Sequence, residues 1–306
     1  MPPTPRHPLG EVFGFPTDNF SSEADRYRGH KLCPFGNKVP NCTKDKAENP
    51  LGVCSVKDGG NLTITCPIRF RQNWIIADDA AAFFFPPDVS WTSLTEIRLN
   101  DKHGKSAGNI DVVLVSYDAA GRILDFGALE IQAVYISGNI RQAFAHYMED
   151  PRAHAAMDWS RRRYYPRPDF LSSSRKRLAP QLIYKGGILH AWQKKTAVAL
   201  DSSFYRTLPS LSEVEPGEAD IAWMIYDLQY VSAENRYQLV QNKIVYTKFG
   251  DALDRITRAE PGPIEDFIGD LQQKLDEKLE DGDSAPPDAP TLQDIIRSGE
   301  TAEGDR

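Results

Sequence analysis

Residues 108–132 read GNIDVVLVSYDAAGRILDFGALEIQ, and this stretch decides the fold class. Two β-prone runs, IDVVLVSY and RILDFGALEIQ, flank the turn signal DAAG, so we expect an antiparallel hairpin. Each run also carries polar residues that packing alone does not require. Asp111 lies at the start of the first run, and Glu130 and Gln132 lie two residues apart near the end of the second.

The register of this hairpin determines whether its polar residues meet. With Tyr117 placed opposite Arg122 across the turn, Asp111 falls about two residues short of Glu130. A bulge or a longer turn of one or two residues brings the two acids side by side. Side chains two apart on a strand share a face, so Glu130 and Gln132 point the same way. We therefore expect the three polar groups to converge at one end of the hairpin.

Two carboxylates on neighbouring strands repel each other at neutral pH unless a cation lies between them. Mg²⁺ suits such a pair because it prefers hard oxygen ligands and keeps several waters. A bound Mg²⁺ lowers the pKa of an attacking water and stabilises charge on a phosphodiester oxygen, while Gln132 would orient the water. The alternative reading is an edge hairpin whose polar ends are simply solvated.

The composition is that of a globular protein. The 306 residues suffice for one large domain or two smaller ones, and 41% of them are hydrophobic, which provides material for a core. No apolar run is long enough to cross a bilayer. The N-terminus, MPPTPRHPLG, lacks the apolar core of a signal peptide. We therefore expect a cytoplasmic protein with no membrane partner.

The net charge of −7 does not exclude a nucleic-acid partner, because the charge is unevenly distributed. Residues 251–306 contain 16 Asp and Glu but 6 Lys and Arg, whereas residues 137–185 contain ten Lys and Arg and four acids. Such a basic band is either a solvated face or a phosphate-binding surface that releases counterions. The candidate contacts to nucleic acid are Arg161, Arg162, Arg163, Arg175, Lys176, Arg177, Lys194 and Lys195.

All the cysteines of the chain lie within 34 residues near the N-terminus. Disulfides are rare in cytoplasmic proteins. Four thiolates form a tetrahedral cage for zinc or iron, and such a site can fold a loop-rich segment that is too small for a core of its own. The spacing therefore predicts a metal site at Cys33, Cys42, Cys54 and Cys66.

The stretch GNIDVVLV…GALEIQ resembles the catalytic core of the PD-(D/E)XK nuclease superfamily. It is similar in particular to the NotI-type restriction endonucleases, in which the terminal Lys of the motif is replaced by Gln. The resemblance implies that Asp111 and Glu130 bind the catalytic Mg²⁺ and that Gln132 takes the variant position. The carbonyl of Ile131 is implied as an extra ligand, and Glu96, fifteen residues before Asp111, matches a further acid.

The cysteines extend this resemblance. Their order, CPF…C…GVCxV…CP, is similar to the N-terminal four-cysteine iron site of NotI-type enzymes, with zinc as the competing occupant. The resemblance implies a structural iron and a type II restriction endonuclease that cuts double-stranded DNA, leaving 5′-phosphates and 3′-hydroxyls. It also implies a homodimer on a GC-rich palindrome, for example one containing GGCC, because a two-fold protein matches a two-fold site.

The expected architecture is mixed α/β, a PD-(D/E)XK core with a central mixed sheet flanked by helices. Residues 1–75 form a loop-rich four-cysteine subdomain, residues 76–258 the catalytic and DNA-binding domain, and residues 259–306 an acidic, mostly flexible tail. Helices are predicted through IIADDAAAFFF, through NIRQAFAHYME with Ser137 as the cap, through LIYKGGILHAWQKK and through IEDFIGDLQQKLDEKL.

Two other functions are compatible with parts of this sequence. One is a non-catalytic, metal-stabilised protein that binds specific DNA sequences, but the joint presence of Asp111, Glu130 and Gln132 argues against it. The other is a redox protein that transfers electrons through thiolate-bound iron. That protein would need neither a carboxylate pair nor an arginine-rich band.

Overall fold

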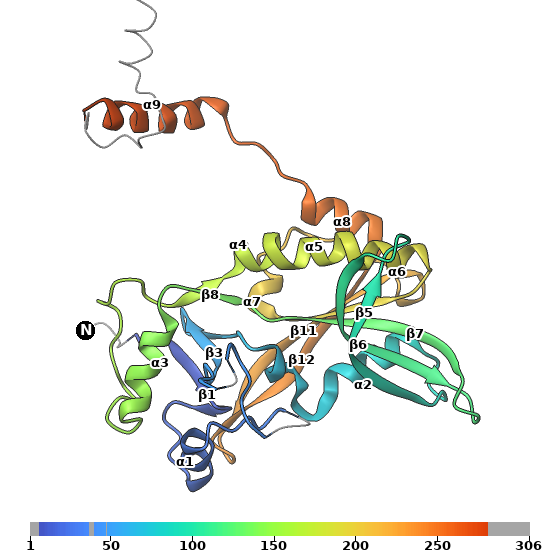
Figure 1. Ribbon diagram of the computed structural model, residues 1–306, viewed down its shortest axis with the longest axis horizontal. Coiled ribbons are helices and arrows are strands. Elements are labelled where there is room, and N and C mark those ends of the chain that lie inside the picture. Colours follow the sequence, from blue (N-terminus) through green and yellow to red (C-terminus); the bar gives the residue numbers. More distant parts are fainter. Residues whose placement is uncertain (1–5, 37–39, 47, 281–306) are drawn as a thin grey trace, which may run out of the picture. The chain divides into compact units, whose positions relative to one another are not determined.

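A six-stranded sheet in the order β12-β11-β10-β7-β6-β5 forms the centre of the protein (Figure 1). The computed structural model describes residues 6–36, 40–46 and 48–280. Strand β10 runs parallel to β7 and to β11, and the other neighbours are antiparallel, so the expected mixed sheet is confirmed. The strands are β5 (Trp91–Asn100), β6 (Ser106–Tyr117), β7 (Ile123–Gln132), β10 (Thr196–Asp201), β11 (Ile221–Val231) and β12 (Arg236–Thr247).

The predicted hairpin is formed by β6 and β7. Its turn begins at Asp118, whose backbone N–H donates to the Arg122 carbonyl, and Gly121 adopts the left-handed φ of +77° that this turn requires. Tyr117 pairs with Ile123 rather than with Arg122, and a bulge follows between Ser116 and Tyr117. The extra residues needed to bring the two acids together are therefore present.

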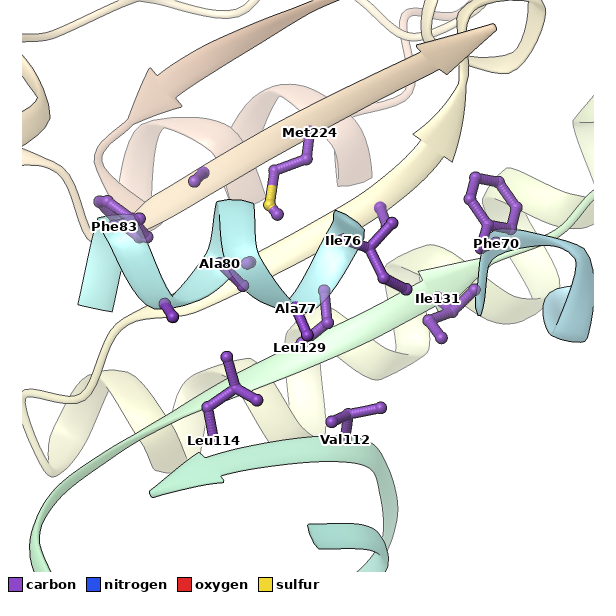
Figure 2. Packing of buried hydrophobic residues seen from close by; sticks show 14 of the residues in the cluster. Phe70, Ile76, Ala77, Ala80, Phe83, Val112, Leu114, Leu129, Ile131 and Met224 are labelled. Atoms are coloured by element: carbon purple, nitrogen blue, oxygen red, sulfur yellow. The ribbon is translucent and has the colours of Figure 1, made fainter. Parts of the chain in front are cut away.

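One face of the sheet is covered by α2 (Ile75–Phe84), the helix predicted from the alanine-rich run before Pro86. Its buried side chains pack on alternate residues of β6, β7 and β11, as Figure 2 shows. Packing of this kind fixes the faces of the strands, because residues two apart point the same way. The core beneath α2 includes Ile76, Ala80, Phe83, Val112, Leu114, Leu129, Ile131 and Met224.

The other face is covered by a continuous helical run over residues 170–191 and by α8 (Phe249–Thr257) (Figure 1). The predicted helix in this region is confirmed, but it begins earlier, at Phe170, and ends earlier, at Ala191, so Trp192–Lys195 lie outside it. Gly186 does not break it, and the lack of a side chain lets Phe249 approach, since a methyl group there would meet its ring at 2.9 Å. The run consists of α4 (Phe170–Ser173), a π turn (Ser174–Leu178), α5 (Ala179–Gln181), a second π turn (Leu182–Gly186) and α6 (Gly187–Ala191).

The N-terminal segment contains more regular structure than its composition suggests. A second sheet has the order β2-β1-β3-β4, in which β3 carries Cys54 and the adjoining loops carry the other three cysteines. The fully buried guanidinium of Arg69 lies 3.0 Å from the Glu11 carboxylate and donates to the Tyr237 carbonyl, so it joins this sheet to β12. The elements are β1 (Leu9–Val12), β2 (Phe15–Pro16), α1 (Ser22–Gly29), β3 (Val53–Asp58), β4 (Asn61–Ile64) and a 3-10 segment (Pro67–Trp74).

The predicted helix α3 (Ile140–Glu149) is present, but Ser137 does not cap it. The cap is Asn139, whose side-chain oxygen accepts from the Gln142 N–H. Ser137 instead belongs to a short ribbon, because its backbone pairs with Arg167. The remaining elements of this part are β8 (Tyr135–Ser137), β9 (Arg167–Asp169), α7 (Ser202–Tyr205) and a 3-10 turn (Pro216–Glu218).

The chain divides into two compact units, with the boundary after Thr257. The predicted helix of the second unit is confirmed as α9 (Ile264–Glu280). No helix in the described ranges is long and apolar enough to cross a membrane. The flexibility expected for the acidic tail mostly concerns residues 281–306, which lie outside the described residues.

Gly127 offers a test of the packing between β7 and α2. A methyl group at this position would meet the ring of Phe84 at 2.4 Å. We expect Gly127→Ala to lower the stability by about 1–3 kcal/mol, because overpacking strains a close-packed core. Thermal unfolding followed by circular dichroism measures the change.

Gly250→Ala is the matched control, since no atom lies within 4 Å of the position of its new methyl group. We expect this change in α8 to leave the melting temperature equal or slightly higher. Equal effects of the two substitutions would contradict the described packing.

Candidate active site and metal centre

Asp111 and Glu130 lie opposite each other on β6 and β7, next to the register pair Val112–Leu129. The Ile131 N–H donates to Asp111 Oδ2 at 2.8 Å, which fixes the Asp111 carboxylate against β7. Because Leu129 and Ile131 face α2, Glu130 points to the opposite face, under the helical run of residues 170–191. The structure thus brings the two predicted acids together.

Glu130 is a buried carboxyl group with only one of its two oxygens engaged. It is 5% exposed, and its Oε2 accepts from Lys185 Nζ at 2.6 Å. Its Oε1 has no hydrogen-bond partner within the described ranges. Burial raises the pKa of Glu130 to about 8, the ammonium group of Lys185 opposes this rise, and the nearby Asp111 adds to it. The charged form of Glu130 therefore needs a further positive charge.

Gln132 lies beside Glu130 on the same face, as predicted. It is 1% exposed, and its amide nitrogen donates to the side-chain oxygen of Gln181. Its own side-chain oxygen has no partner in the part of the chain that the structure describes. The carbonyl of Ile131, the implied extra ligand, is 3.5 Å from a nitrogen of Arg177. Glu130 Oε1 and Gln132 Oε1 are thus two buried oxygens without partners in the described structure, and both residues line the same pocket.

Glu96 lies on the edge strand β5 between the pairs Thr95–Val112 and Ile97–Ile110, and so opposite Asp111. The acids Glu96, Asp111 and Glu130 therefore form one row across three strands. Glu96 is exposed and has a left-handed φ of +57°, which is uncommon for a residue with a long side chain. Strain of this kind in a strand is typical of functional sites.

The carboxylate oxygens of Glu96, Asp111 and Glu130 do not all lie within 4.8 Å of one another, so the row of acids is not a preformed metal site. Within the described ranges, the one group of three or more His, Cys, Asp or Glu whose ligand atoms lie within 4.8 Å of one another is His146, Glu149 and His154. The rings of His146 and His154 stack at 3.9 Å, and His154 Nδ1 bonds the His146 carbonyl at 2.6 Å. Stacking and hydrogen bonding account for that group.

Sequence reasoning missed the contribution of the helical run. Lys185 is 4% exposed, and its Nζ donates to Glu130 and, at 2.8 Å, to the carbonyl of Asn109. The available signal was the four-residue spacing of Arg177, Gln181 and Lys185, which places polar residues on one helical face.

Seven of the eight predicted DNA contacts fall into two groups, and the eighth, Arg177, is half-buried beside the Ile131 carbonyl. Arg161, Arg162 and Arg163 are exposed on the loop before β9, and Arg175 and Lys176 are exposed on the helical run. In contrast, Lys194 Nζ is 2.6 Å from Asp125, and Lys195 Nζ donates to the Phe83 carbonyl at 2.9 Å. The first group presents positive charge at the surface, with Arg162 over the Trp159 ring and Arg163 over the Tyr164 ring, whereas the second group is engaged with Asp125 and the Phe83 carbonyl.

The four cysteines come from two loop ends and two strand ends of the N-terminal segment. Cys33 and Cys42 follow Leu32 and Asn41, whose backbones form an isolated β-bridge. Thr65, the residue before Cys66, donates its N–H to the Cys54 carbonyl at 3.0 Å. All four are free thiols. Cys33, Cys42 and Cys66 line a pocket of about 150 Å³, which Lys44, Arg71, Trp74 and Thr95 also line.

The chemistry of this donor set fits a thiolate-bound metal. Burial, followed by the charges of neighbouring cysteines, raises the pKa of Cys42 to about 11 and that of Cys54 well above its ordinary value. A bound cation reverses such shifts, because a coordinating thiol loses its proton. The sulfur atoms of the described segment do not form a group of three within 4.8 Å, so ligation requires the loops to draw together.

The comparison with protein families bears directly on this site. The model of the restriction endonuclease NotI family matches residues 18–239, which is more than half of the chain and includes the cysteines, the hairpin and the helical run. No curated protein matches the sequence. The chain therefore belongs to the NotI restriction endonuclease family, which makes it a type II restriction endonuclease, a hydrolase that acts on double-stranded DNA.

Proposed function

We propose that this endonuclease hydrolyses phosphodiester bonds at the row of acids between β5 and β7, in a Mg²⁺-dependent reaction. The observation that carries the proposal is the pairing of Asp111 with Glu130, where Glu130 Oε1 and Gln132 Oε1 are buried and lack partners in the described structure. Such oxygens cost about 1–3 kcal/mol each when left unsatisfied, so a cation at this place offsets a real penalty.

Each residue then has a distinct task. Asp111, Glu130 and the carbonyl of Ile131 would hold Mg²⁺, and Glu96 would add a fourth oxygen from the facing strand. When bound, Mg²⁺ lowers the pKa of a water and stabilises charge on the phosphate. Gln132 orients the water through its unpaired side-chain oxygen. The water gives up a proton to solvent as its oxygen bonds to phosphorus, and the bond from phosphorus to O3′ breaks as O3′ takes up a proton, leaving a 5′-phosphate and a 3′-hydroxyl.

The substrate proposal rests on charge and symmetry. The exposed arginines of residues 161–163 and the exposed pair Arg175 and Lys176 suit phosphate contacts and guanine readout, because arginine binds guanine O6 and N7 in a bidentate manner. We propose a GC-rich palindrome as the target, for example one containing GGCC. A homodimer would place one active site on each strand. We also propose that the enzyme acts in the cytoplasm.

We propose that residues 1–75 act as a metal-stabilised subdomain with Cys33, Cys42, Cys54 and Cys66 as ligands. Iron is the proposed occupant and zinc the alternative, because an all-sulfur cage suits either ion. The metal would have a structural role. It would hold together loops that have no apolar core of their own and take no part in hydrolysis.

The nuclease proposal is tested by Glu130→Gln and Asp111→Asn, which remove a charge without changing side-chain size. We expect either change to slow cleavage of a plasmid in Mg²⁺ by roughly 100-fold or more, because several kcal/mol of charge stabilisation are lost. Binding to the same plasmid fragments in Ca²⁺, measured by gel shift, should remain within about threefold, since arginine contacts to phosphate provide most of the affinity.

Asp78→Asn is the matched control, because Asp78 is exposed on α2, on the other face of the sheet. It should cut at the wild-type rate, and EDTA should stop the wild-type enzyme. Normal cleavage by the Glu130 or the Asp111 variant would place the hydrolytic site elsewhere.

The cysteine proposal is tested by elemental analysis of the purified protein. We expect about one iron or zinc per chain, and Cys42→Ser should lose this metal and lower the melting temperature by several degrees, because metal binding contributes folding free energy.

The Glu130→Gln variant provides the control for that measurement. It should keep the cysteine-bound metal while losing cleavage, which separates the two sites. A fully folded wild-type protein containing neither iron nor zinc would refute the metal-stabilised subdomain.

A further inference from the structure

The helical run of residues 170–191 completes the active site from the side opposite α2. Three of its residues reach three consecutive residues of β7. Arg177 approaches the Ile131 carbonyl at 3.5 Å, Gln181 accepts from the Gln132 amide, and Lys185 contacts Glu130 at 2.6 Å. The run thus places a polar ladder directly on the strand that carries the proposed catalytic residues.

The two π turns make this ladder possible. In a regular α-helix, with 3.6 residues per turn, a residue four positions on is rotated about 40° past the first, so a four-residue repeat drifts off the strand. A π turn closes its hydrogen bonds over five residues instead of four and reduces this drift. The π turns span Ser174–Leu178 and Leu182–Gly186, and each includes one end of the ladder. Such turns occur frequently at functional sites.

The buried position of Lys185 is not explained by stability alone. A buried ion pair contributes little net stability, because the desolvation of both charges offsets their attraction, and an apolar pair of similar volume is often as stable. The Lys185 ammonium joins the carbonyl of Asn109, two residues before Asp111, to the carboxylate of Glu130. It therefore links the β6 backbone just before Asp111 to the Glu130 side chain on β7.

The ammonium group also keeps one donor unused. It has three N–H groups, of which two are donated, and no third partner is found within the described ranges. Beside it, Glu130 Oε1 and Gln132 Oε1 are unpaired, and the cavity that these side chains line has room for about one water, at about 10 Å³. Gln132 carries no charge, so it cannot provide the positive charge that the Glu130 carboxylate needs.

On the basis of the proposed nuclease function, we infer that Lys185 supplies the positive charge of the hydrolytic site. It holds the Glu130 carboxylate beside Asp111, and its third N–H donates to a water in the cavity of about 10 Å³ that Lys185, Glu130 and Gln132 line. The helical run is then part of the active site, with Gln181 aligning Gln132 and Arg177 approaching Ile131.

The test measures cleavage, DNA binding and stability of Lys185 variants of the full-length enzyme. We expect Lys185→Met to lower the single-turnover cleavage rate in Mg²⁺ roughly 100-fold, as loss of one preorganised donor does. DNA affinity in Ca²⁺ should stay within about threefold. Lys185→Arg, which keeps the charge, should recover at least about tenfold of the lost rate. Lys102→Met, a change at an exposed lysine, is the control and should cut normally.

A purely structural role predicts a different pattern. The double variant Glu130→Gln with Lys185→Met removes the buried pair, and we expect it to melt in EDTA within about 2 °C of the wild type. A large loss of melting temperature in this variant, together with lost DNA binding by Lys185→Met, would assign Lys185 to the fold instead. Cleavage by Lys185→Met within about threefold of the wild-type rate would also overturn the inference.

Two further comparisons keep the outcome decisive. Should Lys185→Met fail to fold, Lys185→Gln replaces it, because an amide can still donate to the Asn109 carbonyl, and the same thresholds apply. Asp111→Asn separates this inference from the proposed function. If that variant is inactive while the Lys185 variants cut normally, the role of Lys185 alone is refuted.

Discussion

The register between β6 and β7 is the constraint on which the rest of the site depends. A slip of one residue would turn Glu130 and Gln132 toward α2 and would turn Leu129 and Ile131 toward the helical run of residues 170–191. The packing of Leu129 and Ile131 against α2 opposes such a slip, and the bulge after Ser116 sets where the acids fall. The same apolar contacts that stabilise the sheet therefore place the carboxylates.

The same arrangement destabilises the folded protein at the proposed active site. The helical run buries two oxygens that have no partner in the described structure, Glu130 Oε1 and Gln132 Oε1, and burial also raises the pKa of the Glu130 carboxyl group. The strained backbone of Glu96 adds to the cost, opposite Asp111. The site departs from the usual pairing of buried polar atoms and from the usual backbone conformation of a strand, whereas the apolar core around it follows the expected packing. This is the pattern expected where function rather than folding selects the residues.

The sequence was sufficient for those parts of the site whose geometry is local. The pairing of Asp111 with Glu130 follows from a hairpin and its turn, and the shared face of Glu130 and Gln132 from the strand period. Lys185 could not be assigned in this way, because it lies 55 residues from Glu130, and only the tertiary packing of the helix brings them into contact. The π turns and the left-handed Glu96 leave no mark in hydrophobic periodicity, so they too required the structure.

The cysteine cluster and the row of acids are physically connected rather than separate modules. The pocket that Cys33, Cys42 and Cys66 line also includes Thr95, the residue before Glu96 on the edge strand β5. An edge strand has a neighbour on one side only, so its position depends more on side contacts than that of β6 or β7. If the thiols drew together around a metal, the position of β5 would therefore change before that of β6 or β7. A structural metal in this place can affect cleavage without touching DNA, through the placement of the first acid in the row.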